Sequence, residues 1–317
     1  MKKTSKIFLS GHGGMVGSSM YSLLQKKGYN NVITRTRNEL DLKKQSSVEE
    51  FFKIEKPEIV FLFAAKVGGI LANNTFKADF IYDNLIIQSN IIDSSHRFGV
   101  KKLIFMGSAC IYPKFASQPI KEEELLNGKL ETTNEPYAIA KIAGIKLCES
   151  YFHQFGSNFI SIMPNNLYGQ NDNFDLKNSH VMPALIRKIY EAKLSNNPEV
   201  EVWGTGKPLR EFLYVDDLAD AALFLAKKLE AKKLYDDMKI SHINVGSGNE
   251  ISIKNLAYLI KDIIGYDGNL HFNGKLDGTP RKFLDLSRLE SLGWASSTTL
   301  KEGITKTFNW YKSTKHD

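Results

Sequence analysis

Short apolar runs alternate with segments of helical periodicity in the first half of the chain. Runs with the length of buried strands lie at 6–10, 31–35, 59–65, 102–107 and 159–164. Between them, the three-to-four-residue spacing typical of one buried helix face occurs at 15–27, 48–53, 79–98 and 137–155. This alternation predicts an α/β fold, a Rossmann-type doubly wound parallel sheet with helices on both faces.

The pattern changes after residue 166. Gly, Asn, Asp and Pro are frequent from 168 to 183. Further helical patterns lie at 183–194, 217–228, 253–264 and 300–311, with strand candidates at 200–203 and 270–272. We therefore expect residues 1–166 to form a nucleotide-binding domain, to which 211–225 returns. Residues 167–317 are expected to form mainly a smaller C-terminal substrate domain.

A glycine turn joins the first strand to the first helix. Gly11, Gly14 and Gly17 permit a tight turn and bring backbone N–H groups close to a bound pyrophosphate. Met15 and Val16 begin the helix, whose N-terminus favours negative charge. An ordinary glycine-rich loop is the alternative, but the strand–turn–helix setting predicts a dinucleotide site.

Basic residues follow the second predicted strand. NAD-binding domains often carry an acidic residue here for the ribose hydroxyls, whereas this chain has Arg35 and Arg37. Guanidinium groups match a 2′-phosphate bidentately, so the pair predicts NADP(H). A solvated basic pair is the alternative interpretation. Asp41 and Leu42 follow closely and are expected to border the adenine.

Three residues predict carbonyl chemistry. Tyr137 and Lys141 are separated by one helical turn and share a helix face. We expect the ammonium to lower the pKa of the phenol, so that the phenol exchanges a proton near neutral pH. Ser108 supplies a second hydroxyl for the same carbonyl oxygen. With the glycine turn, this set predicts a nicotinamide-dependent oxidoreductase.

Longer motifs carry a more specific resemblance. They are AKVGGI at 65–70, GSACIYP at 107–113, NEPYAIAK at 134–141, NSH at 178–180 and DGTPRK at 277–282. With the glycine turn, these segments resemble the extended short-chain dehydrogenase/reductase family, and within it the GDP-L-fucose synthase branch, over nearly the whole chain. The resemblance implies NADP(H), a GDP-linked 4-keto-deoxy sugar as substrate, and a homodimer.

The resemblance also implies residue roles. Ser108, Tyr137 and Lys141 become the reductase triad, and Cys110 and His180 shuttle protons at the sugar ring. Further cofactor contacts are implied at Ala64, Ala65, Lys141, Pro164, Asn166, Leu167 and His180. Substrate contacts are implied at Asn165, Arg187, Lys188, Trp203, Arg210, Asp277 and Lys282. No metal is implied.

The implied chemistry is consistent, because a C4 ketone acidifies the hydrogens at C3 and C5. A thiol and an imidazole beside the ring can remove and return those protons while the two hydroxyls stabilise the enolate oxygen. The same hydroxyls can then hold the ketone for hydride attack. Ordinary structural roles remain open for Cys110, as a small buried residue, and for His180.

The chain departs from the branch pattern at three positions. Gly13 stands where a basic residue is frequent, and Asn165 and Gln170 stand where Thr and Pro are usual. A reductase-only paralogue acting on another GDP-4-keto sugar, such as a 6-deoxy-heptose, is therefore the closest alternative. A nucleotide-sensing protein on an inactive reductase fold is a third hypothesis, which the intact triad disfavours.

Composition narrows the class further. The 317 residues include 42 basic and 35 acidic side chains, a net charge of +7 that fits either a solvated surface or attraction for anionic substrates. The chain has no long Lys/Arg block and no zinc-type spacing, so we expect no nucleic-acid partner. Two cysteines give no disulfide framework, and the first apolar run is too short for a signal peptide. We expect a cytoplasmic enzyme without membrane association.

Overall fold

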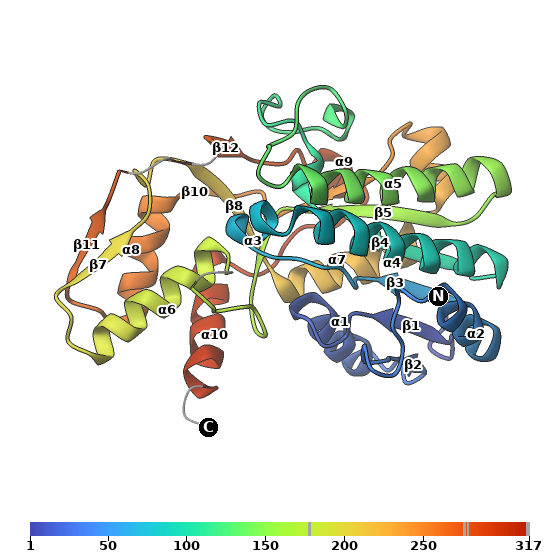
Figure 1. The fold of residues 1–317 in the computed structure, drawn as a ribbon, viewed down its shortest axis with the longest axis horizontal. Helices are drawn as coiled ribbons and strands as arrows, with labels where there is room; N and C mark the ends of the chain where they lie inside the picture. Colours follow the sequence, from blue (N-terminus) through green and yellow to red (C-terminus); the bar gives the residue numbers. More distant parts are fainter. Residues whose placement is uncertain (177–178, 275–276, 278, 315–317) are drawn as a thin grey trace.

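The computed structural model describes residues 1–176, 179–274, 277 and 279–314, and within them a six-stranded parallel sheet forms the core of the larger half (Figure 1). The strand order is β2-β1-β3-β4-β5-β9. Their bounds are β1 (Ile7–Ser10), β2 (Val32–Ile33), β3 (Ile59–Leu62), β4 (Lys102–Met106), β5 (Phe159–Pro164) and β9 (Ile243–Val245). The predicted doubly wound α/β fold is confirmed.

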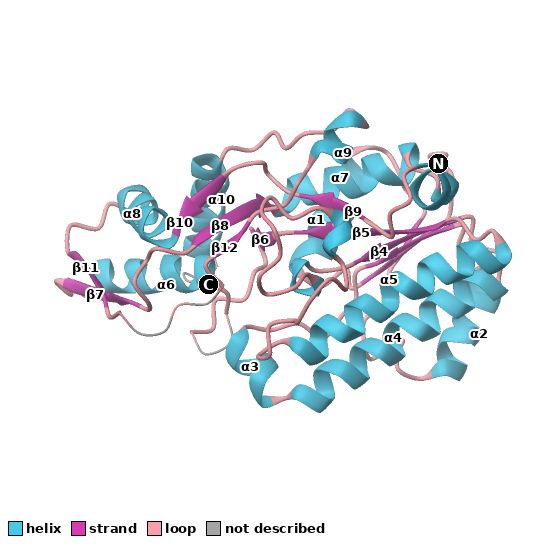
Figure 2. Ribbon diagram, turned by 90° about the horizontal axis from the view of Figure 1, so that it is seen from above, coloured by secondary structure: helices cyan, strands magenta, loops and turns pink. Residues whose placement is uncertain are grey.

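Helices cover both faces of this sheet (Figure 2). Helices α1 (Met15–Lys26) and α7 (Val215–Lys228) pack on one face, and α2 (Gln45–Glu55), α4 (Lys77–Arg97) and α5 (Glu135–Phe155) on the other. Successive strand residues point to opposite faces, so Ile7 and Leu9 join the first core and Phe8 joins the second. Strands buried on both faces explain the continuous apolar runs in the sequence.

The chain reverses its winding between β1 and β3. From β1 it passes to β2 on one side, and then crosses to β3 on the other side. Ligands of open α/β sheets bind at such a switch point, beyond the carboxyl ends of the strands. The glycine turn after β1 and Ala64 after β3 both lie there.

The smaller half of the molecule has its own core. Its main sheet consists of β6 (Asn166–Tyr168), β8 (Leu209–Tyr214), β10 (Glu250–Ser252) and β12 (Arg281–Lys282). The strands β7 (Glu199–Val202) and β11 (Asn269–Phe272) pair separately. Helices α6 (Val181–Leu194), α8 (Ile253–Ile264) and α10 (Leu300–Ser313) complete this part. Shorter elements are α3 (Ile70–Thr75), α9 (Ser287–Ser291), the 3-10 turns Ala109–Ile111 and Glu122–Glu124, and the π turn Lys233–Asp237.

Several strands were not expected from the sequence. β8 interrupts its apolar pattern with Arg210 and Glu211, and β6, β9, β10 and β12 have only two or three residues each. Two later segments return to the larger half. Helix α7 packs in its first core, and β9 pairs with β5 at the edge of the six-stranded sheet. The division into domains at residue 166 stays a prediction. Among the described residues, no helix is long and apolar enough to span a bilayer.

Candidate active site

The turn after β1 requires glycine at two positions. Gly11 has φ +79°, and a Cβ on it would lie 2.7 Å from the backbone nitrogen of Ala64. A Cβ on Gly17 would lie only 2.0 Å from the Gly11 carbonyl oxygen. Gly14 precedes α1 with extended backbone, and the described first turn of α1, from Met15, carries no acidic side chain. The helix N-terminus therefore suits a pyrophosphate, and the residues present fit a dinucleotide.

The two arginines after β2 differ in their surroundings. Arg35 forms an ion pair with Glu55, at 2.6 Å between Nη2 and Oε1, and lies over the Phe51 ring. Arg37 is exposed to solvent. Arg35 is therefore already paired with residues of α2, and Arg37 is the more accessible guanidinium for a 2′-phosphate.

The expected adenine border lies beside these arginines. Asp41 Oδ1 accepts a hydrogen bond from the Lys43 backbone N–H at 3.1 Å. The Leu42 carbonyl oxygen accepts one from Asn90 Nδ2 at 2.9 Å, which ties this segment to α4. Both residues therefore lie in a fixed segment after β2.

Helix α5 brings Tyr137 and Lys141 to the end of β4. Lys141 is buried, and its Nζ donates to the Met106 carbonyl oxygen at 2.8 Å while lying 5.8 Å from the centre of the Tyr137 ring. Burial lowers the pKa of Lys141 to about 8. Burial also raises the pKa of Tyr137, a nearby Cys110 thiolate raises it further, and a hydrogen bond with Ser108 opposes the rise. The expected lowering of the phenol pKa by the ammonium is therefore wrong for this arrangement, because burial dominates.

Ser108 and Cys110 belong to the loop that follows β4. Cys110 lies in the 3-10 turn Ala109–Ile111 and is 8% exposed. Burial raises the pKa of its thiol, while a hydrogen bond with Ser108 and the charges of Lys282 and Lys141 lower it. The structure thus brings two hydroxyls, a thiol and two cations to one place.

Lys282 reaches this place from β12, far along the chain. Burial lowers its pKa, and proximity to a Cys110 thiolate raises it. Asn165 Nδ2 donates to the Lys282 carbonyl oxygen at 3.4 Å and to Glu211 Oε2 at 2.6 Å. Asn165 thus links the end of β5 to the strand that carries Lys282.

Sequence reasoning missed Glu211. This carboxylate is fully buried on β8 and accepts hydrogen bonds from the backbone N–H groups of Gly248 at 2.8 Å and Leu284 at 3.2 Å. Burial raises its pKa, although these bonds and the one from Asn165 oppose the rise. A charged residue inside an apolar run is the signal that identifies such a position.

Two further expected substrate residues lie together. Lys188 Nζ is 4.6 Å from the centre of the Trp203 ring, which is 68% exposed. Burial lowers the pKa of Arg210, and the charge of Asp277 raises it. Arg210 Nη1 donates to the Leu209 carbonyl oxygen at 2.8 Å. An exposed aromatic ring beside cations suits a nucleobase and a diphosphate.

Other expected contacts serve local structure. Asp277 accepts hydrogen bonds from Thr205 N–H at 2.9 Å and from its hydroxyl at 2.6 Å, and so closes the loop after Trp203. Arg187 pairs with Glu191 on its own helix, with 2.8 Å between Nε and Oε1. Both side chains are therefore engaged within the protein.

The remaining expected cofactor residues lie in α1, after β3, and at the junction of β5 and β6. Pro164 ends β5, and Ala65 follows Ala64 beyond β3. Asn166 Nδ2 donates to the Glu211 carbonyl oxygen at 2.9 Å. The Val16 and Leu167 side chains pack against the first core.

His180 lies far along the chain from the loop that carries Cys110. It precedes α6; part of its surface is exposed, yet the surrounding protein desolvates the imidazole and lowers its pKa. Among the residues that the structure describes, no hydrogen bond joins His180 to Cys110. Two motif positions, Asn178 and Gly278, lie outside the described residues. The described contacts therefore join the triad and the thiol, and the role of His180 as a second proton carrier stays a prediction.

This fold and site define a dinucleotide-dependent enzyme of the short-chain dehydrogenase/reductase type. Residues 7–246 match the NAD dependent epimerase/dehydratase family, and the chain belongs to that family. The expected resemblance is thereby confirmed.

Within this family, the chain is similar to GDP-L-fucose synthase from Escherichia coli (strain K12), with 51% identity over 308 residues, 96% of each chain. Among solved structures, it is similar to a GDP-6-OMe-4-keto-L-xylo-heptose reductase from C. jejuni, with TM-score 0.94, 42% identity and 99% coverage of both chains. A GDP-mannoheptose C4 reductase from Campylobacter jejuni with NADP bound gives TM-score 0.92 and 45% identity, covering 98% of this chain and 99% of that one. NADP in that relative agrees with the cofactor expected from the sequence.

Proposed function

We propose that this enzyme uses NADPH to reduce the C4 ketone of a GDP-linked 4-keto-6-deoxy sugar after 3,5-epimerisation, giving GDP-L-fucose. The observation that carries the proposal is the convergence of Ser108, Cys110, Tyr137 and Lys141 at the ends of β4 and α5. The 51% identity with a GDP-L-fucose synthase over nearly the whole chain supports the substrate.

Reduction needs a proton donor and support for the charge that forms. Bound NADPH supplies the hydride. The raised pKa of Tyr137 keeps its proton in place at neutral pH, so the phenol can deliver it to the carbonyl oxygen. The Lys141 ammonium stabilises the phenolate that remains, and the Ser108 hydroxyl helps to orient the same oxygen.

Epimerisation needs a base beside the ring. Cys110 is the candidate, because it lies beside Ser108, Lys282 and Lys141; burial raises the pKa of its thiol, and these three neighbours oppose that rise. The hydroxyls of Ser108 and Tyr137 stabilise the enolate oxygen during each proton transfer. One oxyanion site then serves both reactions. We assign the return of the proton on the opposite ring face to His180.

A reductase without epimerase activity is the second candidate. The solved relatives at 42% and 45% identity are named as GDP-heptose reductases. Such an enzyme would take a GDP-4-keto sugar such as a 6-deoxy-heptose.

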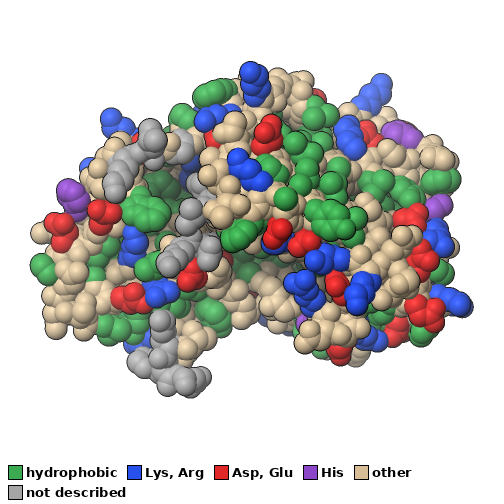
Figure 3. All heavy atoms as spheres, viewed as in Figure 1, with side chains coloured by type: hydrophobic (Ala, Val, Ile, Leu, Met, Phe, Trp, Pro, Cys, Tyr) green, Lys and Arg blue, Asp and Glu red, His purple; other side chains and the backbone are tan. Residues whose placement is uncertain are grey.

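We also propose a homodimer in the cytoplasm. Hydrophobic side chains gather over α4 and α5 (Figure 3), where Tyr82 is 63% and Ile139 42% exposed. Burying this face against a second copy would remove them from water. Sedimentation of wild type and Tyr82→Glu tests the dimer, and an unchanged dimer in the variant would rule out this face. Both cysteines are free and buried, as is usual in a reducing compartment.

One incubation tests the function. Wild-type protein, NADPH and GDP-4-keto-6-deoxy-mannose are combined in heavy water, with absorbance and product mass as readouts. We expect NADPH oxidation and deuterium at C3 and C5. Oxidation without ring deuterium would identify a reductase only, and the absence of oxidation with both hexose and heptose substrates would contradict the proposal.

A further inference from the structure

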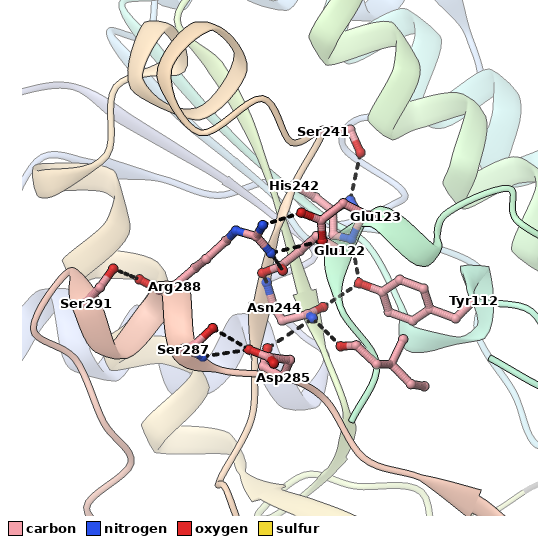
Figure 4. Close-up of polar contacts among 11 residues, drawn as sticks. Tyr112, Glu122, Glu123, Ser241, His242, Asn244, Asp285, Ser287, Arg288 and Ser291 are labelled. Atoms are coloured by element: carbon pink, nitrogen blue, oxygen red, sulfur yellow. Dashed lines mark hydrogen bonds and ion pairs between the residues drawn. The ribbon is translucent and has the colours of Figure 1, made fainter. Parts of the chain in front are cut away.

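A buried polar network holds the loop that carries Ser108 and Cys110 (Figure 4). Tyr112 follows Cys110 by two residues and is 2% exposed. Its side chain points from the loop towards β9, with its Oη 2.6 Å from His242 Nε2 and 2.5 Å from Asn244 Oδ1. Two partners therefore fix the side chain of a residue that follows the catalytic thiol by two positions.

Hydrogen-bond chemistry gives the network one direction. Asn244 Oδ1 can only accept, so the Tyr112 hydroxyl donates to it. His242 Nε2 must then donate to the Tyr112 oxygen, and His242 Nδ1 accepts from the Ser241 hydroxyl at 2.9 Å. Burial, together with the charges of Lys146 and Arg288, lowers the pKa of His242 to about 3, so the ring is neutral, as this assignment requires.

The far end of the network is fixed by charge. Asn244 donates from its backbone N–H to Glu122 Oε1 at 3.1 Å, and from Nδ2 to the carbonyl oxygens of Ile120 and Asp285 at 3.0 and 3.2 Å. Arg288 pairs with Glu122 Oε2 at 2.5 Å. The network thus joins the catalytic loop, the turn at Glu122–Glu124, β9 and α9, which lie far apart in the sequence.

We propose that Tyr112 is a positioning residue, which holds the Ser108–Cys110 loop in catalytic register through its paired bonds to His242 and Asn244. The loop has only a single 3-10 turn of its own regular structure, so the network supplies the constraint that regular structure would otherwise give. Small displacements of a reacting group reduce rates strongly. The inference rests on the proposed function, because the register matters for that chemistry.

Tyr112→Phe tests it, with Tyr235→Phe as the matched control. Tyr235 is also buried and donates one hydroxyl bond, to the Phe159 carbonyl oxygen at 2.9 Å, but lies away from the catalytic loop. Both variants should melt below wild type. At a temperature where both stay folded, Tyr112→Phe should lower kcat by roughly 10- to 100-fold with KM for NADPH unchanged. Tyr235→Phe should keep the wild-type kcat.

A second readout does not depend on substrate. The rate of Cys110 alkylation by iodoacetamide is measured against pH by peptide mass, with buried Cys148 as an internal reference. Tyr112→Phe should shift this profile, and Tyr235→Phe should not. A wild type that fails to reduce the sugar would overturn the proposed function while leaving this readout intact. If Tyr112→Phe matches Tyr235→Phe in both kcat and alkylation, the positioning role is wrong.

Replacement of His242 sharpens the result. Gln retains an N–H donor that can reach the Tyr112 oxygen, whereas Leu does not. His242→Gln should therefore keep more of kcat than His242→Leu at comparable melting temperature. Equal losses in the two variants would contradict a role for the hydrogen bond between His242 and Tyr112.

Discussion

At the cofactor end of the site, backbone atoms shape the surface, whereas at the sugar end side chains from distant segments do so. Gly11 and Gly17 lie so close to neighbouring backbone that any side chain would collide. Near Cys110, by contrast, Asn165 donates hydrogen bonds to Glu211 and to the Lys282 carbonyl oxygen. These three residues belong to three different strands or strand ends. Substitutions at the first end should therefore damage the fold, and those at the second should damage the chemistry.

The largest effect is expected at Tyr137. Tyr137→Phe removes the final proton donor, so sugar reduction should fall by about 10²–10⁴-fold. Melting temperature and NADPH affinity should stay near wild type, because one hydroxyl contributes little to the core. Stopped-flow reduction and calorimetry measure these quantities. Reduction at the wild-type rate would show that another group gives the proton.

Gly17→Ala should show the opposite profile. Its new methyl group meets the Gly11 carbonyl, so unfolding in urea should require roughly 3 kcal/mol less free energy. Gly13→Ala is the matched control, since no atom of the described chain lies within 4 Å of its Cβ position, and it should change stability by no more than about 0.5 kcal/mol. Equal stabilities of the two variants would contradict the claim that close backbone packing at the cofactor end excludes a side chain.

The pH dependence should report Lys141. Its pKa of about 8 means that the ammonium loses its proton above this pH, while Tyr137 keeps its own because burial raises its pKa. The kcat/KM for reduction should fall above pH 8, approaching about tenfold per pH unit. Lys141→Arg should move that fall upward, because guanidinium stays charged. A wild-type profile that is flat from pH 7 to about 9.5 would contradict the role of the ammonium.

The smallest effect is expected from substitution of the arginines that would bind the 2′-phosphate of NADPH. Arg37→Ala should reduce the preference for NADPH over NADH by about tenfold, the usual worth of a charged hydrogen bond. Arg35→Ala should do less, since Arg35 is paired with Glu55. Steady-state kinetics with both cofactors give the ratio. Equal specificity constants in the wild type would show that phosphate recognition is absent.

Local patterns made the glycine turn and the Tyr137–Lys141 pair predictable. The glycine spacing, and Tyr137 with Lys141 on one helix face, follow from residues within a few positions of each other. The strand β5 and the helix α8 end where their apolar patterns end. Periodicity contains all the information that such elements need.

The sugar end depends on pairing across long distances. β8 contains two charged residues, so its sequence pattern does not resemble that of a buried strand. The structure explains Glu211, because its carboxylate accepts hydrogen bonds from the backbone N–H groups of Gly248 and Leu284. The contact of Tyr112 with His242 and Asn244 likewise appears only once β9 joins the sheet. The ion pair between Arg35 and Glu55 needed the packing of α2. Single-chain patterns do not encode these partners.

The central claim is that one oxyanion site serves two reactions, with Cys110 needed only for the first. The most direct measurement is Cys110→Ser in heavy water, given NADPH and either GDP-4-keto-6-deoxy-mannose or the same sugar already epimerised. Serine is a much weaker base beside a carbon acid, so deuterium entry at C3 and C5 should stop. Reduction of the epimerised sugar should continue, because Ser108, Tyr137 and Lys141 remain. Undiminished exchange in the variant, or loss of both activities in a folded protein, would contradict the account.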